Sequence, residues 1–295
     1  EENNIGWSRL LEDAGCQVIY GLDGYKVHSK LCLITRKNGG QVEYITQIGT
    51  GNYNEKTAAM YTDLSLMTAN PAIGKDAAEF FKNMSIGNLA GQYDYLIVSP
   101  TSLKQKILYL MDEEIKKGSN GRIIMKMNSV TDVDFIQKVS EASRSGVKVD
   151  LIVRGICCIL PGVTGYTDNV RVMSVVGRYL EHPRIFSFGS GNDQKIYIGS
   201  ADMMTRNTEK RVEVAAPILD QDIRRQINHY LKVMLSDNVK ARVLGSDGKY
   251  RRKEQKEPYI DSQNVFMQEA LQAKPPQEVP EKIGLLKRIG RIFSR

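Results

Sequence analysis

One sequence pattern occurs twice in this 295-residue chain and limits the folds that it can adopt. Each copy begins with a histidine and has Lys or Arg two positions later. A strand, a polar turn, a second strand and a Gly-(Thr/Ser)-x-(Asn/Asp) loop follow. The copies run from His28 to Asn52 and from His182 to Asp202. Because each copy of an internal repeat usually forms one structural unit, the pattern predicts two similar half-sites related by a pseudo-two-fold axis.

The first histidine lies within residues 25–36, which we predict to form one β-strand because β-forming apolar residues dominate the segment. Side chains alternate between the faces of a strand, so His28 and Lys30 would share a face. A histidine beside a fixed positive charge suits phosphate chemistry. A His-x-Lys triplet alone is also common on solvated strand faces, and only the second copy favours a functional site.

Hydrophobic periodicity predicts an α/β chain. The strand at 123–127, the helix at 132–145 and the strand at 147–153 predict a right-handed β-α-β unit in a parallel sheet. Residues 85–91 are predicted to be a linker, and the composition from Gly248 onward predicts a linker or disordered tail. Further helices are expected at 4–14, 71–84, 103–117 and 220–235, and further strands at 16–20, 42–47, 63–67, 95–98, 169–175, 185–188, 195–198, 211–217 and 239–244.

Near the end of the chain, apolar residues recur at helical spacing with basic residues between them, from Lys282 to Arg295. This pattern predicts a basic amphipathic helix, which could lie on an anionic membrane surface or dock on protein. Gly284 and Gly290 lower its helix propensity.

The composition is that of an ordinary globular protein, with 41% hydrophobic and 25% charged residues. A net charge of +7 favours an anionic partner, or else only aids solubility. Nucleic acid is not indicated, because aromatic residues are few and no recognition motif is present. Cys32 and Cys158 lie in or beside apolar runs and are predicted to be small core residues, so a reduced, cytoplasmic setting is expected.

Six runs of residues carry a resemblance to a known family. They are Gly24–Lys30, Ile48–Thr57, Tyr61–Asp63, Leu151–Cys157, Arg178–His182 and Ser200–Asn207. The doubled pattern resembles the phospholipase D superfamily. The amino-acid sequences of the six runs are similar to the C-terminal half of the bacterial polyphosphate kinases. The resemblance implies two phospholipase D-like α/β domains, residues 1–92 (truncated at the N-terminus) and 93–255. Residues 256–295 would form the linker and the basic tail.

The same resemblance implies a function, which is reversible transfer of the ATP γ-phosphate to inorganic polyphosphate through a phosphohistidine. ATP, ADP and polyphosphate would be the ligands. Magnesium is expected from ATP chemistry, although no metal ligands are identified in the chain. Further N-terminal domains and a homo-oligomer are also implied. The chain does not begin with Met, so we expect part of a longer protein that can lack full activity alone.

Two histidines are predicted to be catalytic. His28 is the candidate nucleophile, because a neutral imidazole with a reference pKa near ~6.5 can attack phosphorus at neutral pH. His182 could protonate the leaving oxygen or donate to the transferring group. The resemblance places His182, Arg154 and Tyr61 in the ATP site. Independently of it, Arg154 follows a strand expected in a parallel sheet, where a guanidinium can bind phosphate or pair with a carboxylate.

Other residues are weaker candidates for binding or supporting phosphate, and the glycine-rich loops that follow each hairpin offer backbone N–H groups. His229 is expected to be structural or at the surface. The weaker candidates are Lys30, Asn52, Asn54, Arg184, Asp202, Arg206 and Arg211.

One departure from the superfamily bears on the reaction. The phospholipase signature places an aspartate five positions after the lysine, where this chain has Thr35 and, in the second copy, Gly189. Arg184 also replaces the second lysine. These differences argue against a phosphodiesterase acting on lipid or nucleic acid. That activity and a non-catalytic polyanion-binding role are the alternatives to a kinase.

Overall fold

The structure is a computed structural model, and it describes residues 2–273, with side chains from residue 5 onward. The chain divides into two compact units, residues 1–263 and 264–295. Both predicted half-sites lie in the first unit. The basic amphipathic helix predicted for Lys282 to Arg295 lies outside the described residues.

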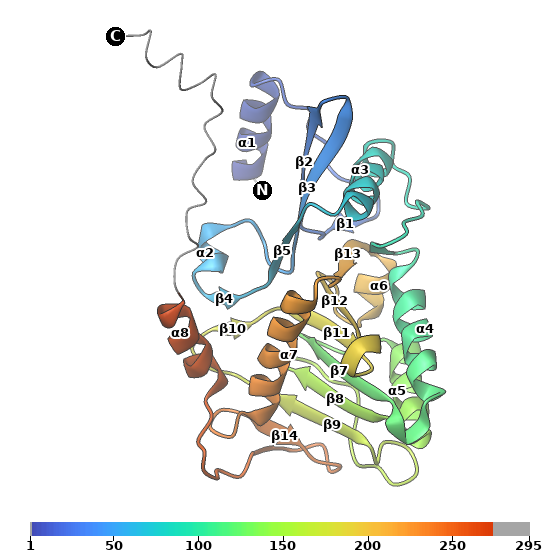
Figure 1. Cartoon of the computed structure of the whole chain (residues 1–295), viewed down its shortest axis with the longest axis vertical. Coiled ribbons are helices and arrows are strands. Elements are labelled where there is room, and N and C mark those ends of the chain that lie inside the picture. Colours follow the sequence, from blue (N-terminus) through green and yellow to red (C-terminus); the bar gives the residue numbers. More distant parts are fainter. Residues whose placement is uncertain (1, 274–295) are drawn as a thin grey trace. The chain divides into compact units, whose positions relative to one another are not determined.

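A ten-stranded mixed sheet forms the centre of the first unit (Figure 1). Strands β7, β8 and β9 are parallel, and α5 (Val133–Arg144) connects β7 to β8. The predicted β-α-β unit is therefore confirmed. The strand order is β1 (Lys26–Val27), β13 (Arg211–Pro217), β12 (Lys195–Gly199), β11 (Arg184–Phe188), β7 (Arg122–Met127), β8 (Lys148–Val153), β9 (Val170–Ser174), β14 (Arg242–Leu244) and β15 (Tyr250–Arg252), with β6 (Ile97–Ser99) beside β13.

Helices cover both faces of this sheet. Alternate side chains of β7 show this, because they point to opposite faces, toward different helices. Met125 and Met127 belong to the apolar core that α4 (Leu103–Ile115) and α5 complete. Lys126 points to the other face, where its ammonium lies 3.3 Å from Glu181, and Tyr230 of α7 (Gln221–Ser236) donates to the same carboxylate. Strands buried on both faces are typical of parallel sheets.

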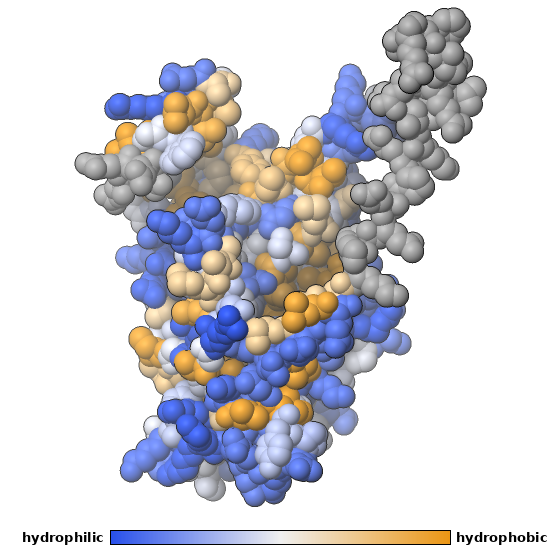
Figure 2. Space-filling model, turned by 90° about the vertical axis from the view of Figure 1, so that its left-hand side faces the viewer, coloured by the Kyte–Doolittle hydropathy of each residue, from blue (hydrophilic) through white to orange (hydrophobic). Residues whose placement is uncertain are grey.

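The first part of the chain forms a separate antiparallel sheet of β2 (Leu31–Asn38), β3 (Gln41–Gly49) and β5 (Ser65–Thr68). Helix α3 (Pro71–Ser85) packs on it at Gly74, where a Cβ would overlap the Tyr44 ring. Helix α1 (Glu2–Asp13) forms as predicted, but its apolar Trp7 and Leu10 remain exposed. Figure 2 shows apolar residues among polar ones at the surface in its upper part, where α1 and the β2–β3 hairpin lie.

Two short parallel ladders join the first part of the chain to the second. β1 pairs with β13 in the large sheet, and β4 (Tyr61–Thr62) pairs with β10 (Leu180–Glu181). In each ladder one strand comes directly before a predicted catalytic histidine. The remaining described elements are α2 (Glu55–Ala58), α6 (Thr205–Glu209), α8 (Ser262–Gln272) and the 3₁₀ turns Gly118–Asn120 and Gly191–Asp193.

The single strand predicted over residues 25–36 is wrong. The chain leaves the large sheet after β1 and enters the three-stranded sheet at β2, so His28 and Lys30 lie in the break between two strands. The backbone N–H groups of His28 and Ser29 both donate to the Val212 carbonyl. The argument from alternating strand faces therefore does not apply at this histidine.

Three other predictions are wrong. Residues 16–20 form no strand, because no strand lies beside them in the part of the chain that the structure describes. The segment after Gly248 is not a linker up to Gln272, since β15 pairs with β14 and α8 follows, with Gln263 buried against Glu181. Cys32 and Cys158 are exposed, because Cys32 lies on the open face of an edge strand and Cys158 in a loop.

Candidate active site

His28 forms a hydrogen-bonded pair with a carboxylate from the other half of the molecule. The β1–β13 register places Val27 opposite Val212, so the next residues, His28 and Glu213, come together. The Nδ1 atom of His28 lies 2.9 and 3.1 Å from the two Glu213 oxygens. A carboxylate can only accept a hydrogen bond, so the ring proton is held at Nδ1.

The same arrangement occurs at His182. The β4–β10 register places Thr62 opposite Glu181, and the next residues are Asp63 and His182. The His182 Nδ1 atom lies 2.8 Å from Oδ1 of Asp63. Each half of the chain therefore supplies a histidine to one pair and the carboxylate to the other.

A hydroxyl from each glycine-containing loop supports each carboxylate. Thr50 donates to Asp63 at 2.7 Å and accepts from the backbone N–H of Leu64. Ser200 donates to Glu213 and accepts from the backbone N–H of Val214. The predicted anion-binding loops thus hold the two acids. Gly51 permits this close approach, because a Cβ there would overlap the Asp63 carboxylate.

The second ring nitrogen distinguishes the two histidines. The Nε2 atom of His182 lies 2.9 Å from Nη1 of Arg184, and because a guanidinium can only donate, Nε2 accepts this bond. The Nε2 atom of His28 has no hydrogen-bond partner within residues 2–273. Of the two Nε2 atoms, therefore, the one of His28 can attack a substrate without first breaking a hydrogen bond to the protein.

Burial favours the neutral form of the His182 ring. The side chain is buried, and desolvation lowers the pKa of His182, an effect that Asp63 opposes and the charge of Arg184 reinforces. Tyr61 packs against the ring with centroids 5.0 Å apart. His28 is more exposed, with 19% of its side chain accessible.

Arg184, a weaker candidate for binding or supporting phosphate, is buried and paired with Asp202 through two hydrogen bonds of 3.2 Å. Asp202 also accepts from the backbone N–H of Asn128 at 2.7 Å. These bonds and the charge of Arg184 outweigh desolvation and lower the pKa of Asp202. The pair fixes the guanidinium beside His182.

Arg154 follows β8, as predicted, and its Nε donates to the Asn128 side chain. The Asn128 amide in turn donates to the His182 carbonyl at 3.3 Å. Burial lowers the pKa of Arg154, which makes no ion pair with a carboxylate in the described part of the chain. The carboxylate pairing that was the alternative for this residue is therefore not found, and its guanidinium can receive an anion.

Lys30 lies beneath His28 rather than beside its ring. The ammonium donates to the His28 carbonyl and is almost fully buried. Desolvation lowers the pKa of Lys30 to about 8, with Glu213 opposing this shift. Lys30 thus contributes positive charge, and its hydrogen bond to the His28 carbonyl stabilises the backbone between β1 and β2.

The other candidates contribute less to this arrangement. Arg211 is the first residue of β13, opposite Lys26. Asn54 caps α2 through its side chain, and Arg206 and Asn52 are exposed. His229 lies on α7.

The sequence prediction missed the residues that orient the histidines, namely Asp63, Glu213, Thr50 and Ser200. One signal was available, because Asp63 follows Thr50 at the same spacing as Glu213 follows Ser200.

The carboxylates of the site do not form a metal centre. Within residues 2–273, no three His, Cys, Asp or Glu side chains come together in a way that could hold an ion. Asp63, Asp202 and Glu213 are each occupied by a histidine or an arginine. No helix among these residues is long and apolar enough to cross a membrane.

Comparison with known proteins identifies the family. Two family models match the chain, Polyphosphate kinase C-terminal domain 1 over residues 1–90 and Polyphosphate kinase C-terminal domain 2 over residues 96–263. The chain belongs to the polyphosphate kinase family. It is 45% identical over 274 residues to the polyphosphate kinase of Staphylococcus haemolyticus, and 48% identical over 253 residues to that of Bacillus cereus. These alignments cover 92% and 85% of this chain but only 38% and 36% of the relatives.

Comparison with solved structures agrees with this family assignment. The polyphosphate kinase of Porphyromonas gingivalis is 35% identical, with a TM-score of 0.84 over 91% of this chain and 42% of that one. A phosphatidylserine synthase of Haemophilus influenzae, 11% identical, covers 78% of this chain and 68% of its own with a TM-score of 0.50, which shows a shared fold alone. The predicted α/β fold class is confirmed by the mixed sheet and the helices that cover it.

Proposed function

We propose that this chain carries the catalytic histidines of a polyphosphate kinase, which transfers the γ-phosphate of ATP reversibly to inorganic polyphosphate through a phosphohistidine on His28. The observation that carries the proposal is the pair of interlocked histidine–carboxylate contacts, of which only the one at His28 leaves Nε2 open. The family membership supplies the reaction class.

The first step is attack by the Nε2 lone pair of His28 on the γ-phosphorus of ATP. An N–P bond forms while the bond from phosphorus to the bridging oxygen breaks, and ADP leaves with that electron pair. Glu213 keeps the proton on Nδ1 and stabilises the positive charge that develops in the ring, as a carboxylate does for other catalytic histidines. In the second step a terminal oxygen of polyphosphate attacks the phosphorus, and the N–P bond breaks.

Fixed positive charge is the second contribution of the site. Charge shifts onto the oxygens of the transferring and leaving groups, and preorganised donors stabilise it best. Arg184 is held by Asp202 and reaches the His182 ring, while Arg154 is held by Asn128. A neutral His182 accepts a hydrogen bond from Arg184, so its role in the proposal is to position this guanidinium. The predicted proton donation would require the ring to gain a proton and release Arg184.

Among residues 2–273 the donor set does not fit a resident metal, since the nearby carboxylates are already paired. Magnesium, expected from ATP chemistry, would enter with the nucleotide, bound mainly by phosphate oxygens. No step above depends on it. The ATP-site assignment of Tyr61 is consistent with its packing on His182, and Lys30 and Arg211 add positive charge near Glu213.

The relatives extend well beyond the matched region, which favours further domains of the same protein as partners. A second copy of the protein, implied by the family resemblance alone, is also part of the proposal. The test uses the intact protein with ATP labelled at the γ-phosphate. Acid-labile, base-stable label on the protein and label in polyphosphate are expected. His28→Ala should remove the protein-bound label, and His182→Ala should slow turnover while some label remains on His28.

Two outcomes would overturn the proposal in different ways. Hydrolysis of a chromogenic phosphodiester without labelling would indicate the phosphodiesterase alternative. Polyphosphate binding with neither label nor turnover would indicate a non-catalytic role.

A further inference from the structure

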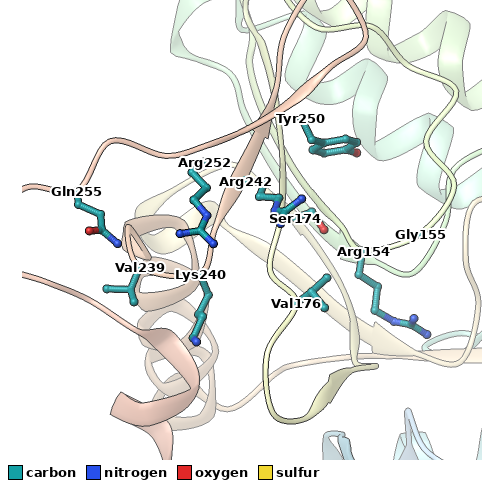
Figure 3. A pocket seen from close by; sticks show the side chains of 10 residues that line it. All are labelled: Arg154, Gly155, Ser174, Val176, Val239, Lys240, Arg242, Tyr250, Arg252 and Gln255. Carbon is teal, nitrogen blue, oxygen red and sulfur yellow. The ribbon is translucent and has the colours of Figure 1, made fainter.

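A basic pocket of about 650 Å³ lies beside the site described above (Figure 3). Its cations come from two places, Arg154 at the end of β8 and Lys240, Arg242 and Arg252 around the β14–β15 hairpin. No Asp or Glu is among the ten residues that line it. Lys240, Arg242 and Arg252 make no ion pair within residues 2–273. The pocket is thus built of unneutralised positive charge.

The register of the hairpin makes this charge costly in the absence of an anion. Arg242 and Arg252 are direct Cα partners across β14 and β15, and like charges opposite one another destabilise a strand pair. The neighbouring Arg251 differs, since it pairs with Asp247. An anion between the two facing guanidinium groups would remove the repulsion and gain charge-assisted hydrogen bonds.

The cations form an extended row rather than one compact cluster. In Figure 3 Arg154 lies at one side of the pocket and Lys240 and Arg252 at the other, with Val176 and Arg242 between them. Arg154 connects the row to the active site, because it donates to Asn128, which donates to the His182 carbonyl. A ligand along this row would carry negative charge at several successive positions.

We propose that Lys240, Arg242 and Arg252 bind a segment of the inorganic polyphosphate chain and lead it past Arg154 toward the histidines. This inference rests on the proposed function. Polyphosphate fits because it carries negative charge on every phosphate and has no base to be recognised. A nucleotide bound here by Tyr250 is the competing occupant, and the experiment separates the two.

The test compares two triple variants of the intact protein. K240Q/R242Q/R252Q removes the three cations of the row. K75Q/K195Q/K232Q removes the same charge from three exposed positions outside the pocket. Equilibrium binding of long-chain polyphosphate, the KM for polyphosphate in ATP formation from ADP, and labelling by γ-labelled ATP are measured for each.

Each exposed charge contact is worth roughly a two- to fivefold change in affinity, so the pocket variant should bind polyphosphate at least about tenfold more weakly. Its binding should also depend less on salt, because fewer charges are screened. Labelling by ATP and the KM for ADP should stay within about twofold of the parent. If the triple variant does not fold, Arg252→Gln alone should weaken binding by roughly two- to fivefold.

Three results would overturn the proposal. Equal losses in both triple variants would show an effect of net charge alone. A raised KM for ADP with unchanged polyphosphate binding would assign the pocket to the nucleotide, as would the same effect in Tyr250→Phe. Unchanged binding of both ligands would leave the pocket without a role in the reaction. Absence of labelling in the parent would instead refute the proposed function, while the polyphosphate binding measurement would still decide the pocket.

Discussion

Replacement of Glu213 by glutamine is expected to slow phosphorylation of His28 by roughly 10- to 200-fold. Glu213 is fully buried, and its two oxygens accept from His28, Ser200 and Asn207. Glutamine keeps the shape but removes the charge and turns one acceptor into a donor that must face another donor. A hydrogen bond to a charged group is worth about 1.5–3 kcal/mol, and each 1.36 kcal/mol corresponds to a tenfold rate change.

The effect should fall on the chemical step and not on ATP binding, because Glu213 lies behind the imidazole. Single-turnover rapid-quench measurements with γ-labelled ATP give the rate of label transfer, and its dependence on ATP concentration gives the affinity. Glu79→Gln is a suitable control, since it makes the same change on α3 at a side chain that is 45% accessible to solvent. A Glu213→Gln protein that melts like the parent and labels within twofold of its rate would refute the role of this pair.

Three further perturbations test the remainder of the site. Asp63→Asn should leave His28 able to accept label but lower steady-state turnover at least about tenfold, because the lost bond to a charged group holds the second histidine; normal turnover would contradict this. Gly51→Ala should reproduce that defect and lower the free energy of unfolding by roughly 1–3 kcal/mol, as measured in urea, because the added Cβ overlaps the Asp63 carboxylate. The depressed pKa of Lys30, about 8, means that the unfolded chain binds more protons between pH 8 and the ordinary lysine value, so stability rises with pH in this range. The free energy of unfolding of the parent, relative to that of Lys30→Met, should therefore rise by on the order of 1–3 kcal/mol between pH 7.5 and pH 10.5, as measured by urea titration. A difference in unfolding free energy that stays constant over this pH range would show that the lysine is not desolvated.

Local patterns predicted most of the elements. Strand β3, helix α3, the β7–α5–β8 unit, the β11–β12 hairpin and β13 lie within one or two residues of the expected ranges. Each has a periodicity, a turn or a cap of its own, so its signal does not depend on distant residues. The duplicated histidine pattern likewise located both histidines, although not the carboxylates that they pair with.

The parts that could not be predicted depend on contacts between distant segments. β1 and β4 are two residues long and carry no periodicity, yet their parallel pairing with β13 and β10 sets which carboxylate meets which histidine. The break at His28 follows from a change of sheet that no local propensity encodes. The buried contacts of Gln263 with Tyr179 and Glu181 explain why a polar segment after Gly248 was mistaken for a linker, since they use hydrogen bonds rather than apolar area.

The nitrogen that carries the phosphate tests the central claim most directly. Intact protein would be labelled with ATP, digested under alkaline conditions that preserve phosphohistidine, and mapped by mass spectrometry, with phosphorus NMR of the labelled protein to distinguish the two ring nitrogens. The proposal predicts phosphate on Nε2 of His28, because Glu213 occupies Nδ1 and Arg184 occupies the matching atom of His182. Phosphate on His182, or on Nδ1 of His28, would contradict it.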